Sequence, residues 1–268
     1  MDAERGRLWV SSAADRGFAG FDPVDTGRSA LFEFDLETLE LLRRIPVPVD
    51  GRPHHLGSMA QGPDGTIYLV DGLIPMLYAL PAGEERLKVY FMARNLVNLR
   101  DLALSPDGRL LYVADYEMGI MVLDLQGEQA YSLETPENFN PGGIDSLLRH
   151  GDYLVVVQNG NSPQRIMRLE LEEGGLKVAS VAPMAVADPA FDFPSLGVMV
   201  DDDLVFVANT RHDPAAPASV QLSSSPVEEV AVLMTTPDIE KFKRDYQESN
   251  PGYVFPDDRE DAEASGDG

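Results

Sequence analysis

Polar residues of the kinds that bind cations or move protons recur at the ends of neighbouring predicted strands. They form four pairs: Ser58 with Asp71, Asp101 with Asp115, Asp145 with Asn159, and Ser195 with Asn209. The start of the first strand of an antiparallel hairpin lies beside the end of the second strand, so the members of each pair should lie together. If several hairpins surround one axis, these oxygens could surround a Ca²⁺ ion. A carboxylate among them could also act as a general base.

Other polar residues flank these pairs, and their roles have two interpretations. His55, Arg100 and Asn161 are close in sequence to the paired residues. The Arg100 guanidinium could clamp a carboxylate or phosphate of a substrate, or it could form a salt bridge with Asp101 or Asp145. In the same way, a carboxylate at a strand end could accept hydrogen bonds from the following loop instead of binding a ligand.

One strand sequence recurs along the chain and sets the positions of these residues. It reads RLWVSS from Arg7, TIYLVD from Thr66, LLYVAD from Leu110, LVVVQN from Leu154 and LVFVAN from Leu204. The turn sequence PDG precedes two of the copies, and Asp-Gly supplies the positive φ that a tight hairpin needs. Another short strand follows each copy. Four short strands in each period of roughly 45 residues are typical of the blades of a β-propeller.

The first copy departs from this pattern. The other four have a further strand ahead of the turn: HLGSMAQ from His55, LRDLALS from Leu99, IDSLLRH from Ile144 and SLGVMV from Ser195. A blade without its innermost strand leaves unpaired backbone groups near the axis. Either a distant segment supplies that strand, or the chain is a late-start version of a longer protein, which we favour. The sequence thus predicts an all-β propeller with five visible repeat units, the first lacking its innermost strand.

Composition excludes several classes of partner. The chain of 268 residues contains 45 Asp and Glu against 21 Lys and Arg, for a formal net charge of −24, and no Cys. Such an acidic protein would repel a nucleic acid, and the absence of Cys excludes disulfides and thiolate chemistry. No apolar run is long enough to span a membrane. We therefore expect a small-molecule substrate or ligand, with no nucleic acid and no membrane as partner.

The ends of the chain carry two further expectations. No secretory leader is visible, so the chain as it stands should be cytoplasmic, or periplasmic or secreted if a signal precedes Met1. We predict propeller blades over residues 1–237 and a C-terminal extension over residues 238–268. The extension should be partly helical and then end in an acidic, disordered tail.

Three longer phrases resemble the gluconolactonase and regucalcin superfamily, also called the senescence marker protein family. They are GGIDSLLRHGDYLVVVQNGNSPQRIMRLEL at 142–171, FDFPSLGVMVDDDLVFVAN at 191–209 and LALSPDGRLLYVADY at 102–116. The resemblance covers about Asp2 to Asn209. It implies a six-bladed propeller, N-terminally incomplete in this chain, that hydrolyses sugar lactones or related esters with one calcium ion on its axis.

The resemblance and the strand-end pairs together predict a site. Asp145 in GID, and Asn159 and Asn161 in QNGN, match the related bacterial proteins. The predicted metal ligands are Asp145, Asp101 and Asn159, and the predicted catalytic residues are Asp145 and Asp101. The predicted substrate-binding residues are His55, Ser58, Arg100, Asn159, Asn161 and Ser195.

Two functions remain open from the sequence. The first is a divalent-metal-dependent hydrolase of a sugar lactone or related ester, in which Ca²⁺ polarises the carbonyl and Asp145 or Asp101 is a ligand or general base. The second is a non-catalytic small-molecule-binding propeller that has lost the metal site. Ser58 and Arg100 stand where the family carries amide ligands, and a guanidinium would repel calcium. These substitutions favour the second function, and the resemblance favours the first.

Overall fold

The computed structural model describes residues 1–14, 16, 18, 20–210 and 221–226. The chain divides into two compact units, Met1–Glu229 and Val230–Gly268, and all the described residues belong to the first unit. The predicted C-terminal extension over 238–268 lies outside the described residues and stays a prediction. No helix in the described part of the chain is long and apolar enough to cross a membrane.

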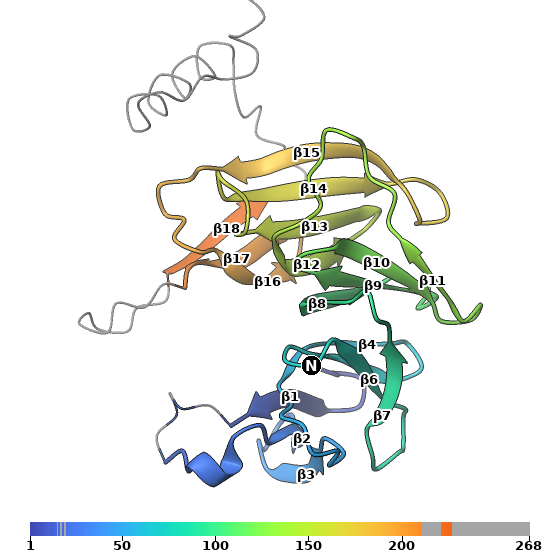
Figure 1. Cartoon of the computed structure of the whole chain (residues 1–268), viewed down its shortest axis with the longest axis vertical. Coiled ribbons are helices and arrows are strands. Elements are labelled where there is room, and N and C mark those ends of the chain that lie inside the picture. Colours follow the sequence, from blue (N-terminus) through green and yellow to red (C-terminus); the bar gives the residue numbers. More distant parts are fainter. Residues whose placement is uncertain (15, 17, 19, 211–220, 227–268) are drawn as a thin grey trace, which may run out of the picture. The chain divides into compact units, whose positions relative to one another are not determined.

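The described residues form five antiparallel sheets, in which strands adjacent in the chain are adjacent in the sheet (Figure 1). The first sheet contains β1 (Arg7–Ala13), β2 (Ser29–Asp35) and β3 (Leu41–Pro46), with a short 3₁₀ helix η1 (Pro23–Asp25) between β1 and β2. The second contains β4 (Leu56–Gln61), β5 (Ile67–Asp71), β6 (Met76–Leu80) and β7 (Lys88–Met92). The third contains β8 (Leu99–Leu104), β9 (Leu110–Asp115), β10 (Gly119–Asp124) and β11 (Gln129–Ser132).

The remaining two sheets continue this order. The fourth contains β12 (Ile144–His150), β13 (Tyr153–Gln158), β14 (Arg165–Leu171) and β15 (Val178–Val186). The fifth contains β16 (Ser195–Val200), β17 (Asp203–Asn209) and β18 (Gln221–Pro226). The first strands of the second to fifth sheets, β4, β8, β12 and β16, contact one another in succession, and β1 contacts β4. We call β4, β8, β12 and β16 the inner strands.

The PDG turns connect the first and second strands of two sheets, as the sequence predicts. Gly65 and Gly108 have φ of 85° and 69°, a conformation that glycine adopts without a steric penalty. The Asp64 carboxylate accepts a hydrogen bond from the Thr66 N–H at 2.9 Å, and Asp107 accepts one from the Arg109 N–H at 3.0 Å. These local bonds fix the turns and hence the register of the hairpins.

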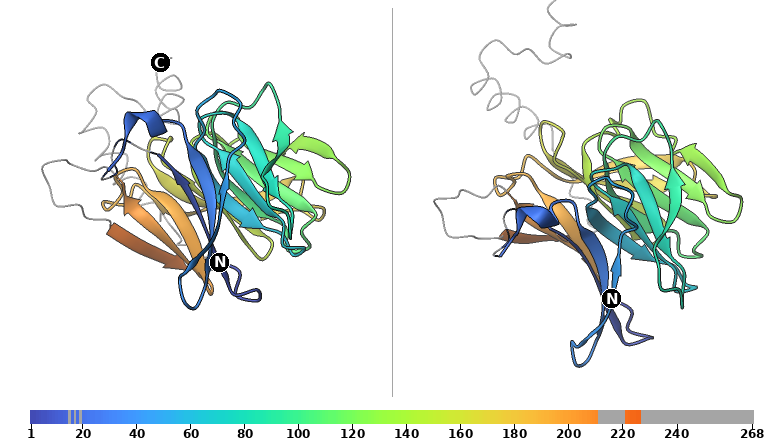
Figure 2. Two further views of the ribbon diagram at one scale, coloured as in Figure 1. Left: turned by 90° about the horizontal axis from the view of Figure 1, so that it is seen from below. Right: turned by 60° about the horizontal axis from the view of Figure 1, so that its bottom comes forward.

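Four hydrophobic clusters hold the sheets together, each between two sheets that follow one another in the chain. Alternate residues of β9 enter different clusters. Leu111 and Val113 pack with the second sheet, and Tyr112 and Ala114 pack with the fourth. Because side chains alternate between the faces of a strand, one apolar strand can serve both clusters. Figure 2 shows the resulting succession of separate sheets in colour order from blue to orange.

The first sheet differs from the others in the way that the sequence predicts. Its order is β1-β2-β3, so β1, which contains the first copy of the recurrent strand, has no inner strand beside it among the described residues. The strands β5 and β9 are buried along their whole lengths, whereas β1 leaves Val10 38 % exposed. The fifth sheet also has one open face, on which Val198 is 53 % exposed.

Candidate functional site

A cavity of about 610 Å³ lies where the inner strands and β1 meet. This volume falls within the range of about 300–1,000 Å³ that small-molecule sites occupy. The polar side chains that line the cavity come from all five sheets and the segment before β4: Ser11, Ser12, His55, Ser58, Arg100, Asp145 and Ser195. Five of the predicted site residues, His55, Ser58, Arg100, Asp145 and Ser195, are therefore brought together.

Interruptions of the strand ladders determine which inner-strand residues face the cavity. The pairing of each inner strand with the next strand shifts near its start: between Leu56 and Met59, Leu99 and Asp101, Ile144 and Ser146, and Ser195 and Gly197. The skipped residues are Gly57, Ser58, Arg100, Asp145 and Leu196, and all of them line the cavity. A bulge leaves its extra residue outside the ladder and redirects its side chain. Bulges thus build the polar wall of the site.

Arg100 and Asp145 form the charged centre of this wall. The Arg100 Nε donates to Asp145 Oδ1 at 2.9 Å, and its Nη2 donates to the same oxygen at 2.5 Å. The Ser195 hydroxyl donates to the other oxygen, Oδ2. The predicted salt bridge of Arg100 is confirmed, with Asp145 as its partner. The residue Asp145 is 6 % exposed, whereas the Arg100 side chain is 42 % exposed.

Tyr116 supports the guanidinium from one side. The Arg100 Cζ lies 5.5 Å from the centre of the Tyr116 ring, a cation–π contact. Burial raises the pKa of the Tyr116 hydroxyl, and the nearby Asp145 carboxylate raises it further. The protonated hydroxyl donates to Asn159 Oδ1 at 2.9 Å. This packing restricts the directions in which Arg100 can point.

Asp101 does not line the cavity, and its carboxylate ties inner strands together. Its carboxylate accepts hydrogen bonds from the Leu102 N–H at 2.8 Å, the Leu147 N–H at 2.7 Å and the Ser146 hydroxyl at 2.9 Å. Ser146 in turn accepts the Gly197 N–H at 3.1 Å. Burial raises the pKa of Asp101, although these hydrogen bonds oppose the shift. The arrangement links β8, β12 and β16 through one buried carboxylate.

Asn159 and Asn161 do not line the cavity either. The Asn159 Nδ2 donates to the Pro194 carbonyl at 3.0 Å. Asn161 donates to the Gly142 carbonyl at 2.8 Å and accepts from the Asn140 Nδ2 at 2.8 Å. Both side-chain amides therefore hold neighbouring loops in place. The position of a residue at a strand end does not show whether its amide binds a loop or a ligand.

Sequence reasoning missed a buried polar cluster beside the cavity. The His54 ring Nδ1 lies 2.7 Å from Asp71 Oδ2, and its Nε2 lies 2.9 Å from Asp50 Oδ1. Asp71 Oδ1 also accepts the backbone N–H of His55 at 3.1 Å. His54 is 3 % exposed and His55 is exposed, so the two adjacent rings lie in different surroundings. The available signal was Asp71, the carboxylate at the end of β5.

The residues that the family resemblance assigns to calcium have other partners in the structure. Among the described residues, no group of three or more His, Asp or Glu side chains is placed to hold a metal ion. The Asp145 carboxylate is paired with a guanidinium, and Asp101 and Asn159 have protein partners outside the cavity. Because Ca²⁺ needs several free oxygens facing one point, these residues as arranged do not suit it. The calcium site stays a prediction.

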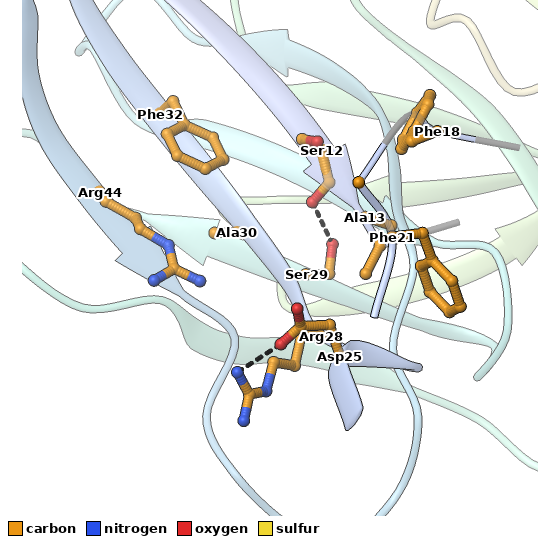
Figure 3. Close-up of a pocket in the computed structure, with 12 residues that line it drawn as sticks. Ser12, Ala13, Phe18, Phe21, Asp25, Arg28, Ser29, Ala30, Phe32 and Arg44 are labelled. Atoms are coloured by element: carbon orange, nitrogen blue, oxygen red, sulfur yellow. Dashed lines mark hydrogen bonds and ion pairs between the residues drawn. The ribbon is translucent and has the colours of Figure 1, made fainter. Parts of the chain in front are cut away.

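A second cavity, of about 400 Å³, lies beside the first sheet (Figure 3). Its wall includes the rings of Phe21 and Phe32 and the guanidinium groups of Arg28 and Arg44. Arg28 is paired with Asp25 at 2.5 Å. Ser12, Ala13 and Phe18 line this cavity and the larger one, so the two adjoin at the end of β1. None of the predicted site residues lines it.

Comparison with known proteins supports the fold. No protein-family model matches the chain, and no curated protein matches it. A solved structure of a nidogen–laminin complex is similar with a TM-score of 0.54 and 14 % identity, covering 68 % of this chain and 67 % of that chain. The WD40 domain of Neurospora crassa Pan2 is similar with a TM-score of 0.55 and 11 % identity, covering 84 % of this chain and 60 % of that one.

A third similar structure is an auxiliary nutrient binding protein from Bacteroides ovatus ATCC 8483. Its TM-score is 0.52 at 14 % identity, and the match covers 67 % of this chain and 47 % of that chain. This chain thus spans less than two thirds of two of the three proteins. At such low identity the similarity shows the fold alone. The repeated antiparallel sheets and these neighbours identify a β-propeller.

Proposed function

We propose that this β-propeller is a non-catalytic binding module, and that the cavity at its inner strands takes a small polar molecule with a carboxylate group. The observation that carries the proposal is Arg100, which lines the cavity beside Ser58, Asp145 and Ser195. A guanidinium has five N–H donors, and Asp145 engages only two of those of Arg100. The remaining donors suit a ligand carboxylate.

The charge of the cavity supports an anionic group at this position. Arg100 is the one Arg or Lys, and Asp145 the one carboxylate, among the described residues that line the cavity. Elsewhere the protein is strongly acidic, with a net charge of −24. A paired guanidinium inside such a protein is a local site for an anion, and the surrounding hydroxyls can bind the other polar groups of the ligand.

A calcium-dependent lactonase or esterase of the gluconolactonase and regucalcin type is the second candidate. The position of Asp145 in the cavity favours it, because a carboxylate there could act as a general base on a bound lactone. The contacts of Asp145 work against this role, since Arg100 and Ser195 already occupy both oxygens of the carboxylate. We therefore favour the binding module over the hydrolase.

Titration calorimetry with D-gluconate and succinate tests the proposal, with D-glucose and succinamide as neutral controls. We expect the carboxylates to bind and the Arg100→Gln variant to bind them at least tenfold more weakly. The matched variant Arg109→Gln removes a guanidinium that pairs with Asp124 at the far end of β9, and it should bind as the unaltered protein does. Equal binding of charged and neutral probes, or no binding, would contradict the proposal.

A second assay separates the two candidate functions. Hydrolysis of D-glucono-δ-lactone and p-nitrophenyl acetate is followed with and without CaCl₂. We expect no turnover above background in either condition. Calcium-dependent turnover that is lost in the Asp145→Ala variant would instead establish the hydrolase.

A further inference from the structure

A third cavity, of about 490 Å³, lies where β3 ends and the chain leads on to β4. Its wall consists of the residues from η1 to the start of β2, the end of β3 and the segment before β4, all within residues 24–54. The structure describes this whole stretch. The cavity shares no lining residue with the cavity at the inner strands, so the two are separate.

The charge of this third cavity is the reverse of that of the whole protein. The side chains in its wall that can carry a charge are those of Arg28, Arg44, Arg52 and His54, and no Asp or Glu of the described residues lines it. The whole chain has 45 Asp and Glu against 21 Lys and Arg. We call this cavity the arginine cavity. Three guanidinium groups in one concave wall attract an anion.

The charge of Arg44 is not offset by a carboxylate in the described part of the chain. Its Cζ lies 6.0 Å from the centre of the Phe32 ring, a cation–π contact. Its side chain has no ion pair or hydrogen bond to any described residue. A guanidinium has five N–H donors, so Arg44 can give several of them to an anion. Arg28 and Arg44 also line the cavity of Figure 3, which adjoins this one.

Arg28 and Arg52 are held by nearby carboxylates that do not line the arginine cavity. Asp50 accepts hydrogen bonds from the Arg52 Nε at 2.7 Å, from its Nη2 and from its backbone N–H at 2.9 Å. The bonds from Arg52 keep the pKa of Asp50 well below its usual value, so Asp50 stays ionised. Arg28 donates one N–H to Asp25 at 2.5 Å, drawn as a dashed line in Figure 3. Each guanidinium therefore retains at least three N–H donors.

A close contact between two segments fixes the arginine cavity. Gly27 has a φ of 78°, and a Cβ at this position would lie 2.5 Å from the Cβ of Pro53. The N–H of His54 donates to the Gly27 carbonyl at 2.9 Å. The segment before β2, which carries Arg28, is thus held against the segment before β4, which carries Arg52. Such a cavity is formed before a ligand enters, so binding costs little reorganisation.

We infer that the arginine cavity binds the phosphate group of a small phosphate monoester. A phosphate monoester carries a charge of about −1.5 to −2 at pH 7 and three strong acceptor oxygens, which three guanidinium groups can share. A carboxylate offers only two oxygens and one charge. Val24, Pro46 and Pro48 form an apolar part of the same wall, which suits the organic part of an ester. The inference does not depend on the proposed function, because it concerns other residues and another ligand.

Titration calorimetry with phenyl phosphate tests the inference on the whole protein at low ionic strength. Benzoate carries the same ring on a carboxylate, phenol carries no charge at pH 7, and inorganic phosphate has no organic part. We expect phenyl phosphate to bind at least tenfold more tightly than benzoate and more tightly than inorganic phosphate, and phenol not to bind. The same titrations in the Arg100→Gln background exclude a contribution from the cavity at the inner strands.

Two variants test the arginine cavity from the protein side. Arg44→Gln and Arg52→Gln should each weaken the binding of phenyl phosphate at least fivefold, because each removes charged hydrogen-bond donors. The matched control is Arg94→Gln, which removes an exposed guanidinium from the β7–β8 segment and should change nothing. Circular dichroism shows whether each variant is folded. Should a variant not fold, the comparison of phenyl phosphate with benzoate on the unaltered protein makes the test.

Each outcome bears on one part of the inference. Equal weakening by Arg94→Gln and Arg44→Gln would mean that general charge causes the binding, and would overturn the site. Benzoate that binds as tightly as phenyl phosphate would overturn the phosphate assignment. Inorganic phosphate that binds as tightly as phenyl phosphate would overturn the assignment to an ester. No binding of phenyl phosphate would overturn the whole inference.

The result is distinguishable from that of the proposed function. Gluconate binding should be the same in Arg44→Gln as in the unaltered protein, because Arg44 does not line the cavity at the inner strands. Loss of gluconate binding in Arg44→Gln would show that the two cavities are not independent and would overturn this separation.

Discussion

Arg100 and Asp145 come from neighbouring inner strands, and two N–H groups of the guanidinium converge on one oxygen of the carboxylate. Each residue occupies the bulge of its own strand. The ion pair therefore depends on two separate ladder interruptions that happen to face one another. The second oxygen of the Asp145 carboxylate accepts a hydrogen bond from the Ser195 hydroxyl. The remaining N–H groups of Arg100 are not used by Asp145.

Neutralising Asp145 should strengthen the binding of a carboxylate ligand. In the Asp145→Asn variant, Arg100 loses the carboxylate that offsets its charge, so gluconate should bind roughly three- to tenfold more tightly. Titration calorimetry at low ionic strength measures the change. Asp152→Asn, which alters an exposed carboxylate in the β12–β13 turn, is the control and should have no effect. Weaker gluconate binding in Asp145→Asn would show that Asp145 itself contacts the ligand.

Removing the Asp101 carboxylate should destabilise the fold and leave the cavity's charged pair in place. Asp101→Ala leaves two buried N–H groups and the Ser146 hydroxyl without their acceptor, at a cost of about 2–4 kcal/mol in the free energy of unfolding. Urea unfolding measures it. Asp107→Ala, in the exposed PDG turn, should cost under about 1 kcal/mol. Equal losses in both variants would contradict a bridging role for Asp101.

Replacing Asp115 should lower the stability of the protein more than it lowers ligand binding. Its carboxylate accepts four backbone N–H groups: those of Val97, Asn98, Glu117 and Met118. Asp115→Ala should lower the free energy of unfolding by about 2–4 kcal/mol, because these donors lose a charged acceptor. Asp124→Ala, which removes an acceptor of two turn N–H groups, should cost less. Chemical unfolding of the two variants ranks them, and the reverse order would refute this account.

Tyr78 should make the protein lose stability in alkali. Burial raises its pKa to about 12, against about 10 for an unfolded tyrosine. This stabilisation is complete below pH 10 and is lost as the pH rises toward 12, because the unfolded state releases its proton first. At pH 11 Tyr78 should lower the free energy of unfolding by about 1 kcal/mol relative to pH 8. Urea titrations at the two pH values measure the difference.

The Tyr78→Phe variant should show a smaller loss of stability between pH 8 and pH 11. Tyr131→Phe, at an exposed position on β11, should leave the loss unchanged. A loss of equal size in all three proteins would mean that other groups cause it. The hydroxyl of Tyr78 lies 3.3 Å from His54 Nδ1, so the Tyr78→Phe variant also tests the buried cluster of His54, Asp50 and Asp71.

Much of the fold could be read from local sequence. The alternation of apolar residues in copies such as LLYVAD, and the Asp-Gly turns before them, determine strands, hairpins and register through neighbours in the chain. The three-stranded first sheet was predicted for the same reason, because no inner-strand sequence precedes the turn at Asp2. The six-bladed count implied by the resemblance stays a prediction.

The candidate site could be read only in part. Sequence pairing at strand ends correctly brought Ser58, Asp145 and Ser195 to one cavity. It also placed Asp101 there beside Arg100, and of these two residues the structure has Arg100 lining the cavity. The strand start LRD does not reveal where a ladder will skip a residue, because that depends on packing between sheets. For the same reason Asn159 and Asn161 could not be separated from ligand-binding amides.

The sequence by itself determined the repeating unit, the turns, the acidic charge and the short inventory of polar residues near the axis. These features follow from side-chain alternation and from contacts between residues close in the chain. Only the tertiary structure decided which of two adjacent residues faces the cavity and which carboxylate pairs with Arg100. Those outcomes depend on bulges and on partners about 45 residues or more apart, which come together only when the sheets pack.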